Sequence, residues 1–297
     1  MPLTIPRWLE PRKVADQDFS LAYAAVADSR RALLKTCIAR HLSWIETGDL
    51  QRVASRLDYR QGFTVFRRSS PAEGLILALA PGVRSPARLL ASVLPAVAAG
   101  VEELAVVLPV DQPDREEPLL TALELAGCEC VFRADTAARD RLFCETAAAG
   151  CDVRMVSMGE SPEAMAADMQ QLVSGGRVML LPGLSLRVGL WWDEDDPLDI
   201  GAVFWAHPDL AIECWNGPAE GVPQSWIRRE GTWKGCLDCR YDALYVPTGK
   251  VEGAASCAHL VLGPGHEGCW AWPGLQSDRF LIHRIGLSGS LPGGSRG

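Results

Sequence analysis

The pattern of apolar and polar positions divides the chain into segments of different character. Between residues 17 and 46, apolar residues recur at spacings of three and four, which predicts one amphipathic helix. Gly48 is expected to end that helix, and Asp49 to cap a second helix that continues to about Arg56. From Gly74 to Leu181 the pattern changes to short apolar runs that alternate with helical segments. Such alternation indicates crossover connections between parallel strands.

The alternating region predicts a series of strands and helices. The predicted strands are Leu75–Ala80, Leu104–Leu108, Cys128–Arg133, Val153–Met158 and Val178–Leu181. The predicted helices are Pro86–Ala99, Pro118–Ala126, Thr136–Ala149 and Pro162–Val173. The first two of these helices begin with proline and are followed by glycine, the usual asymmetry of helix ends. We therefore expect an α/β fold, with a Rossmann-like, mostly parallel sheet covered by helices on both faces.

The amino-acid composition and the periodicity change again after about Leu190. Eight of the ten tryptophans follow this point, together with many Pro and Gly residues and little periodicity. This pattern predicts an irregular C-terminal lobe rich in Trp and Cys. The expected organisation is a helical segment (1–60), a Rossmann-like domain (61–190), a second lobe (191–287) and a disordered Gly/Ser/Pro-rich tail (288–297).

Composition excludes two classes of partner. The net charge is −8, and Lys and Arg residues are not clustered in any segment. We therefore expect no nucleic-acid binding. No apolar run reaches the roughly 20 residues that span a bilayer, so we expect no membrane partner. The N-terminal dozen residues contain three prolines and do not form a signal peptide. Several cysteines fall within helix and strand patterns, as free thiols do, and we expect a cytoplasmic protein.

The segment Gly74–Pro109, which reads LILALAPGVRSPARLLASVLPAVAAGVEELAVVLP after its first residue, resembles a part of the histidinol dehydrogenases. Thr47–Asp58, Val156–Gly183 and Ala206–Glu213 resemble further segments of that family in the same order. The resemblance implies a fold related to the aldehyde dehydrogenases. It also implies oxidation of an amino alcohol, NAD as cofactor, a catalytic zinc and an acid/base pair.

The residues at the aligned positions differ from those that the family's reaction requires. Two zinc-ligand positions fall on Leu172 and Gly175, whose side chains offer a metal no donor atom. The acid/base dipeptide falls on Pro208 and Asp209, so Asp209 is the remaining candidate base. An ordinary aspartate has a pKa near 4, which is poorly matched to base catalysis at neutral pH.

The resemblance also places the cofactor-binding residues. They are the turn Pro81, Gly82 and Val83 and the position of Asp135. An acidic side chain at this last position would repel a pyrophosphate. The sequence thus favours the family's fold over the family's reaction.

A separate constellation of Cys and His lies in the C-terminal lobe. The two-residue gap between Cys236 and Cys239 suits tetrahedral zinc, although the spacing of the remaining candidates is irregular. The full candidate set is Cys236, Cys239, Cys257, His259, His266 and Cys269. The alternative interpretation is a group of unrelated thiols in a loop-rich lobe.

His266 has a second possible role. It ends a Gly263–His266 stretch that weakly resembles a segment near the family's substrate site, which makes His266 a candidate catalytic residue beside Asp209. Two hypotheses stay open. One is a divergent NAD-dependent oxidoreductase that acts on a small molecule. The other is a non-catalytic binding or regulatory protein with a structural metal. A homodimer is compatible with either.

Overall fold

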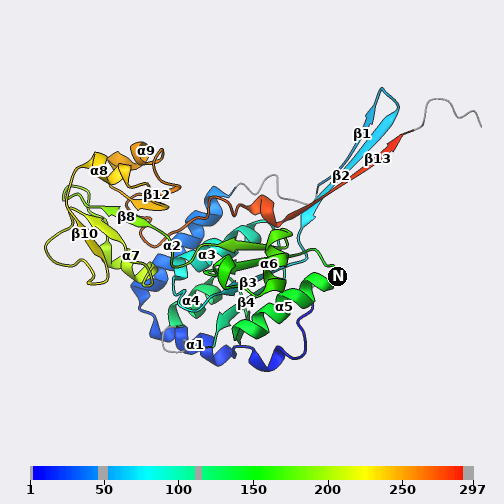
Figure 1. Cartoon of the computed structure of the whole chain (residues 1–297), viewed down its shortest axis with the longest axis horizontal. Coiled ribbons are helices and arrows are strands. Elements are labelled where there is room, and N and C mark those ends of the chain that lie inside the picture. Colours follow the sequence, from blue (N-terminus) through cyan, green and yellow to red (C-terminus); the bar gives the residue numbers. More distant parts are fainter. Residues whose placement is uncertain (1–2, 46–52, 111–115, 290–297) are drawn as a thin grey trace, which may run out of the picture.

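The computed structural model describes residues 3–45, 53–110 and 116–289. Within these ranges the strands form three sheets, ordered β5-β4-β3-β6-β7, β10-β9-β8-β11-β12 and β1-β2-β13. We call them the N-terminal sheet, the C-terminal sheet and the ribbon. Figure 1 shows the ribbon projecting from one side of the N-terminal sheet and its helices, while the C-terminal sheet lies on the other side.

The N-terminal sheet confirms the predicted parallel α/β architecture. All its neighbouring strands pair in parallel. Its strands are β3 (Gly74–Leu79), β4 (Leu104–Pro109), β5 (Cys130–Ala134), β6 (Val153–Met158) and β7 (Val178–Leu181). Their continuous apolar runs are explained by burial on both faces.

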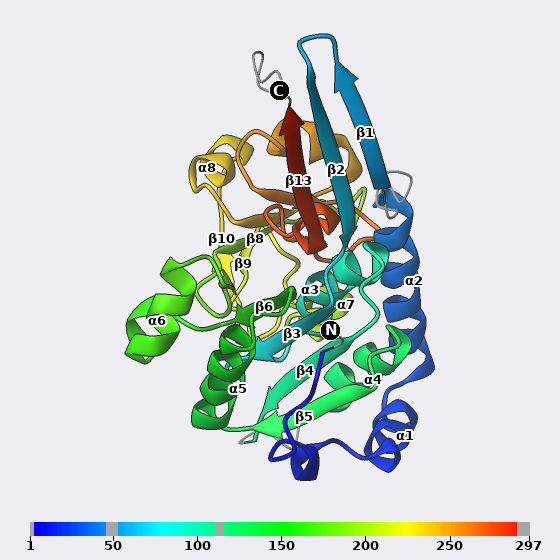
Figure 2. The same ribbon diagram turned by 90° about the vertical axis from the view of Figure 1, so that its right-hand side faces the viewer.

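Helices cover both faces of this sheet. They are α1 (Asp16–Ala25), α2 (Asp28–Trp44), α3 (Pro86–Ala98), α4 (Glu117–Leu125), α5 (Thr136–Ala148) and α6 (Ala167–Ser174). Leu75 and Leu77 pack on the side of α1, α3 and α4, whereas Ile76 and Ala78 pack on the side of α5 and α6. Figure 2 shows α5 and α6 on one side of the sheet and α1 and α4 on the other.

Three helix predictions need correction. The single helix expected over 17–46 is interrupted at Val26, whose extended backbone separates α1 from α2. The apolar spacing continues through both helices, so it conceals this break. Residues 53–56, expected at the end of a second helix, belong to strand β1, while Gly48 and Asp49 lie outside the described residues. The predicted helix Pro162–Val173 is a 3-10 turn at Pro162–Ala164 followed by α6.

The C-terminal lobe is more regular than its sequence predicts. Its strands are β8 (Val188–Trp191), β9 (Glu213–Trp215), β10 (Ile227–Arg229), β11 (Ala243–Tyr245) and β12 (Leu260–Leu262), and its helices α7 (Ile200–Ala206), α8 (Trp233–Asp238) and α9 (Val251–Ala254). The strands pair in parallel. They are too short to carry a detectable period, and β8 begins before the expected boundary at 190. None of the helices in the described ranges is long and apolar enough to cross a bilayer.

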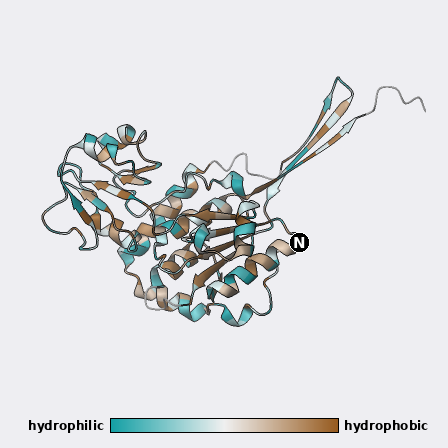
Figure 3. Cartoon of the chain, in the orientation of Figure 1, coloured by the Kyte–Doolittle hydropathy of each residue, from teal (hydrophilic) through white to brown (hydrophobic). Residues whose placement is uncertain are grey.

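The ribbon joins segments that are far apart in sequence. It consists of β1 (Val53–Tyr59), β2 (Phe63–Pro71) and β13 (Leu281–Gly289), all antiparallel. Leu57, Val65 and Leu287 lie directly opposite one another and therefore share one face. Figure 3 shows hydrophobic positions along the projecting ribbon. Ser288 and Gly289, expected in a disordered tail, end β13, and residues 290–297 lie outside the described part of the chain.

Candidate functional site

A buried polar cluster lies where the N-terminal and C-terminal sheets meet. Ser85 caps α3, His207 follows α7 and Tyr245 ends β11. The Nδ1 atom of His207 is 2.9 Å from Ser85 Oγ, and its Nε2 atom is 2.9 Å from the hydroxyl oxygen of Tyr245. All three side chains are excluded from solvent. One histidine thus bridges the two halves of the molecule.

The hydrogen bonds define the proton positions on His207. The Ser85 hydroxyl donates to the carbonyl of Ala206 at 2.6 Å, so Nδ1–H of His207 donates to Ser85 Oγ. Nε2 then accepts the Tyr245 hydroxyl proton. Burial and the nearby Arg88 guanidinium hold the pKa of His207 well below its usual range. The imidazole is therefore neutral at neutral pH, and its two nitrogens serve to join structural elements.

A buried ion pair lies next to this cluster. Arg88 of α3 pairs with Asp209, and its second terminal nitrogen donates to the carbonyl of Gly183 at 2.7 Å. The same Asp209 oxygen accepts the backbone N–H of Arg84 at 2.8 Å. Asp209, the candidate base, is therefore engaged in an ion pair and a backbone contact. Asp209 and Arg88 together link the segments that follow β3, β7 and α7.

A cavity of about 390 Å³ opens beside these contacts, between β7 of one sheet and β12 of the other. Its apolar walls include Met179, Leu181, Leu186, Leu260, Trp270 and Trp272. Its polar lining residues are Asp242, His259 and Arg279. An apolar concave surface with a few polar groups and a volume of hundreds of Å³ is typical of small-molecule sites.

Two tryptophans connect the cavity wall to the buried cluster. The Trp270 ring lies 5.0 Å from the ring of His207, and the Trp272 indole donates to Ser92 Oγ of α3 at 2.9 Å. The two indoles pack edge to face at 5.5 Å. Trp270 Nε1 is buried and has no hydrogen-bond partner among the described residues. The indole N–H groups of Trp192 and Trp226 are likewise buried without a partner among the described residues.

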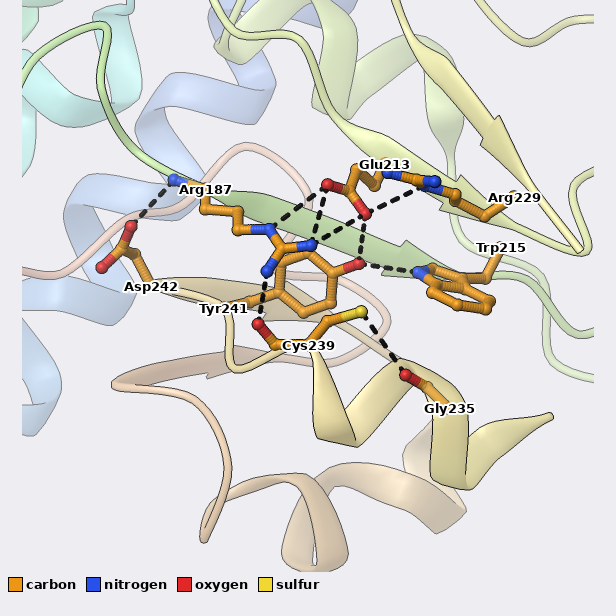
Figure 4. A network of polar contacts seen from close by, with 8 residues as sticks. All are labelled: Arg187, Glu213, Trp215, Arg229, Gly235, Cys239, Tyr241 and Asp242. Atoms are coloured by element: carbon orange, nitrogen blue, oxygen red, sulfur yellow. Dashed lines mark hydrogen bonds and ion pairs between the residues drawn. The ribbon is translucent and has the colours of Figure 1, made fainter. Parts of the chain in front are cut away.

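A second polar network supports the C-terminal sheet near the cavity (Figure 4). Glu213 accepts hydrogen bonds from Arg187, Arg229 and Tyr241, the last at 2.7 Å. Burial acts to raise the pKa of Glu213, but the bonds from Tyr241 and Arg187 outweigh it and keep that pKa below its usual value. The backbone N–H of Arg187 donates to Asp242, which lines the cavity. The network thus holds one polar cavity residue in place.

The sequence-predicted cofactor residues lie in the turn after β3 and at the start of α5. Gly82 has a φ of +91°, which allows the turn between Pro81 and the buried Val83. Asp135 accepts the backbone N–H of Ala138 at 2.8 Å and so caps α5. Its carboxylate occupies the helix end where a pyrophosphate would bind. The cavity lined by Pro81 and Asp135 measures about 20 Å³. The acidic cap that Asp135 places on α5 does not fit a pyrophosphate at this helix end.

The predicted metal ligands do not converge. Cys236 is buried within α8, and the Cys239 thiol donates to the carbonyl of Gly235 at 3.4 Å (Figure 4). Cys257 contacts Ser256, and Cys269 contacts Cys37 instead. Throughout the described ranges, no group of three or more His, Cys, Asp or Glu side chains is arranged to hold a metal ion. The donor set therefore does not fit a zinc site.

The two histidines of the predicted metal set lie in different surroundings. His259 is exposed and lines the cavity, whereas His266 belongs to a turn in which its N–H donates to the Gly263 carbonyl at 3.1 Å. The residues aligned with the family's catalytic site lie on different sides of the N-terminal sheet. Leu172 packs on the α6 side of the N-terminal sheet, while Asp209 contacts α3 on the other side.

Sequence reasoning missed the residues that matter most in this junction: Ser85, Arg88, His207, Tyr245, Trp270 and Trp272. Arg88 carried one usable signal, since it is a charged residue within an otherwise apolar helix pattern. His207 precedes the Pro208 and Asp209 pair that the resemblance singled out. Arg88 and Asp209 are 121 positions apart in the sequence, and Ser85 and His207 are 122 apart. No local pattern therefore links the two residues of either pair.

Comparison with known proteins identifies the fold. No protein-family model matches this sequence, and no curated protein matches it. The structure resembles histidinol dehydrogenase from Elizabethkingia anophelis (TM-score 0.53, 14% identity, covering 94% of this chain and 77% of that one). It also resembles succinate-semialdehyde dehydrogenase from Burkholderia pseudomallei (TM-score 0.51, 11% identity, covering 92% and 84%). The chain therefore has the fold shared by histidinol and aldehyde dehydrogenases.

Proposed function

We propose that this chain is a small-molecule-binding protein built on the aldehyde dehydrogenase-like fold, and that its ligand occupies the cavity between the two sheets. The observation that carries the proposal is an apolar cavity of about 390 Å³ whose few polar lining residues are Asp242, His259 and Arg279. The acidic cap that Asp135 places on α5 supports binding without NAD.

The cavity lining defines the class of ligand. Trp270, Trp272 and the surrounding aliphatic side chains favour a flat or linear apolar body. The cationic Arg279 in the lining favours an acceptor or anionic group at one end. Asp242 is already occupied by the backbone of Arg187. We infer a small aromatic or aliphatic acid, or a neutral molecule with one carbonyl oxygen.

Calorimetric titration with benzoate, octanoate and indole tests the proposal. At least one probe should bind saturably to the full chain. Ala271→Trp places a large ring in the cavity lining and should weaken that binding at least tenfold. Ala255→Trp lies at an exposed position after α9 and serves as the matched control. Absence of binding by all three probes, or equal binding by both variants, would overturn the proposal.

An NAD-dependent oxidoreductase related to the histidinol dehydrogenases is the second candidate. The similarity of fold over nearly the whole chain favours it. The buried engagement of Asp209 and the cap that Asp135 places on α5 count against it. Saturable NAD binding that Val83→Trp weakens would favour this candidate, because Val83 lies in the turn assigned to the cofactor.

A further inference from the structure

Two cysteines from opposite ends of the sequence meet inside the protein. Cys37 of α2 and Cys269 place their sulfur atoms 2.9 Å apart, and the two side chains are 5% and 4% exposed. A disulfide bond is about 2.05 Å long, so the two sulfurs need to approach by less than about 1 Å to form one. Both residues are free thiols in this structure.

The two thiols differ in their electrostatic surroundings. The two thiols are joined by a sulfur–sulfur hydrogen bond, and Arg40, one turn further along α2, adds a positive charge. That hydrogen bond and Arg40 lower the pKa of Cys269 despite its burial, whereas the pKa of Cys37 is raised. Since the thiolate is the reactive form, Cys269 is the nucleophilic member of the pair.

Other buried thiols of this chain provide a contrast. Burial raises the pKa of Cys128 to about 12, that of Cys236 to about 12 and that of Cys214 to about 11. None of these three makes a short sulfur–sulfur contact with a described residue. Burial alone therefore produces inert thiols in this protein, and the Cys37–Cys269 contact is a separate arrangement.

We propose that Cys37 and Cys269 form a reversible oxidation site, in which Cys269 reacts first with a hydroperoxide and Cys37 then closes a disulfide. The Cys269 sulfur attacks one peroxide oxygen, the O–O bond breaks, and a sulfenic acid and water form. The Cys37 sulfur then attacks the Cys269 sulfur, the S–O bond breaks and a second water leaves. Two thiols lose two electrons and two protons, and one hydrogen peroxide becomes two waters. An external dithiol reverses the reaction.

The disulfide would connect two structural elements covalently. Cys269 precedes Trp270 of the cavity wall, and its carbonyl lies 3.4 Å from the hydroxyl oxygen of Tyr245. Cys37 lies on α2, which packs against α3. Oxidation would thus fix the cavity wall to the helical layer of the N-terminal sheet.

Hydrogen peroxide treatment of the reduced, folded full chain tests the proposal, with alkylation of free thiols and peptide mass spectrometry as the readout. The expected first intramolecular disulfide links the Cys37 and Cys269 peptides, and dithiothreitol removes it. At that stage Cys128 and Cys214, of matched burial, are still free thiols and are alkylated once the acid-quenched chain is denatured. Oxidation of Cys269 no faster than of these two, or linkage of Cys269 to another cysteine, would overturn the proposal.

Variants separate the two steps of the reaction. Cys37→Ser removes the resolving thiol, so the Cys269 sulfenic acid should persist and be trapped by dimedone. Cys269→Ser should abolish both the trapped adduct and the disulfide at Cys37. Cys214→Ser, a change at another buried thiol, should still form the Cys37–Cys269 link. A disulfide at Cys37 in the Cys269→Ser variant would contradict the assigned order. The wild-type measurement stands even if a variant does not fold.

Discussion

The guanidinium of Arg88 and the carboxylate of Asp209 form an ion pair at the junction of the two sheets, where the exposed fractions of the two side chains are 0% and 4%. Burial acts to lower the pKa of Arg88, and the charge of Asp209 opposes that effect. The pair therefore stabilises a charge that the interior would otherwise disfavour. The residue that resembles a catalytic base is thus part of the framework that joins the two halves of the molecule.

Removal of one partner of this pair should be strongly destabilising. Asp209→Ala leaves the Arg88 charge buried without its counterion, and we expect a loss of about 3–5 kcal/mol in the free energy of unfolding. Urea denaturation followed by circular dichroism measures it. The double variant Arg88→Met with Asp209→Leu removes both charges and should be more stable than Asp209→Ala alone. Equal stability of wild type and Asp209→Ala would contradict this role.

The buried histidines predict a stability that falls in mild acid. Burial lowers the pKa of His41 from 6.5 to about 4 and holds that of His207 well below 6.5. Between pH 6.5 and 4 the unfolded chain binds protons that the folded chain does not, so stability decreases as pH falls through this window, by up to about 1.4 kcal/mol per pH unit for each histidine. Urea midpoints measured from pH 7.5 to 4.5 should show the decline. His41→Gln should flatten it, whereas His259→Gln, at an exposed position, should not.

The ribbon predicts self-association. Its apolar face carries Val53, Leu57, Tyr59, Phe63, Ile285 and Leu287, which are 39–74% exposed. Exposed apolar surface of this extent usually marks an interface, and a small isolated sheet is only marginally stable. The ribbon and its turn also carry five arginines against one aspartate, although the whole chain has a net charge of −8. We therefore propose a second, acidic copy of the chain as the partner of this face, which would give the homodimer that the sequence left open.

Two neighbouring substitutions test that association. Leu287→Asp charges the apolar face of β13, while Ser288→Asp places the same charge on the opposite face. Sedimentation velocity should find the wild type and Ser288→Asp as dimers and Leu287→Asp as a monomer. A monomeric wild type at micromolar concentration would exclude the homodimer.

Because the candidate zinc ligands are dispersed, we expect that the thermal stability of the protein does not depend on zinc. Cys239 donates to a helix carbonyl and Cys236 is buried in α8, and within the described ranges they do not belong to any group of three or more side chains arranged to hold a metal ion. EDTA should leave the thermal midpoint of the purified protein unchanged. A midpoint that EDTA lowers in the wild type but not in Cys236→Ser, together with one zinc per chain, would restore the zinc hypothesis.

The sequence predicted the N-terminal sheet well because its buried parallel strands are short, mainly apolar runs that alternate with helical segments. It did not predict the ribbon, although Val53, Leu57, Tyr59, Phe63 and Val65 fall at alternating positions around a turn at Gly62. A capping pattern near Asp49 favoured a helix there instead. Strands such as β9 and β10 have three residues each, too few for any period to be visible.

The candidate site was largely beyond sequence reasoning. Ser85 and His207 are separated by 122 positions, and the ring of Trp270 reaches His207 from a third segment. The family resemblance singled out Asp209 and Asp135. In the structure the Asp209 carboxylate pairs with Arg88, and the Asp135 carboxylate caps α5. The cavity arises only when the edges of two separate sheets are brought together, which no local pattern records.

Parallel calorimetric titration of the full chain with NAD and with the apolar probe that binds most tightly tests the central claim most directly. We expect saturable heat for the probe, lost in Ala271→Trp, and no saturable heat for NAD at millimolar concentration. Saturable NAD binding that Val83→Trp weakens, with no probe bound in the cavity, would contradict the claim and identify the chain as a cofactor-binding dehydrogenase.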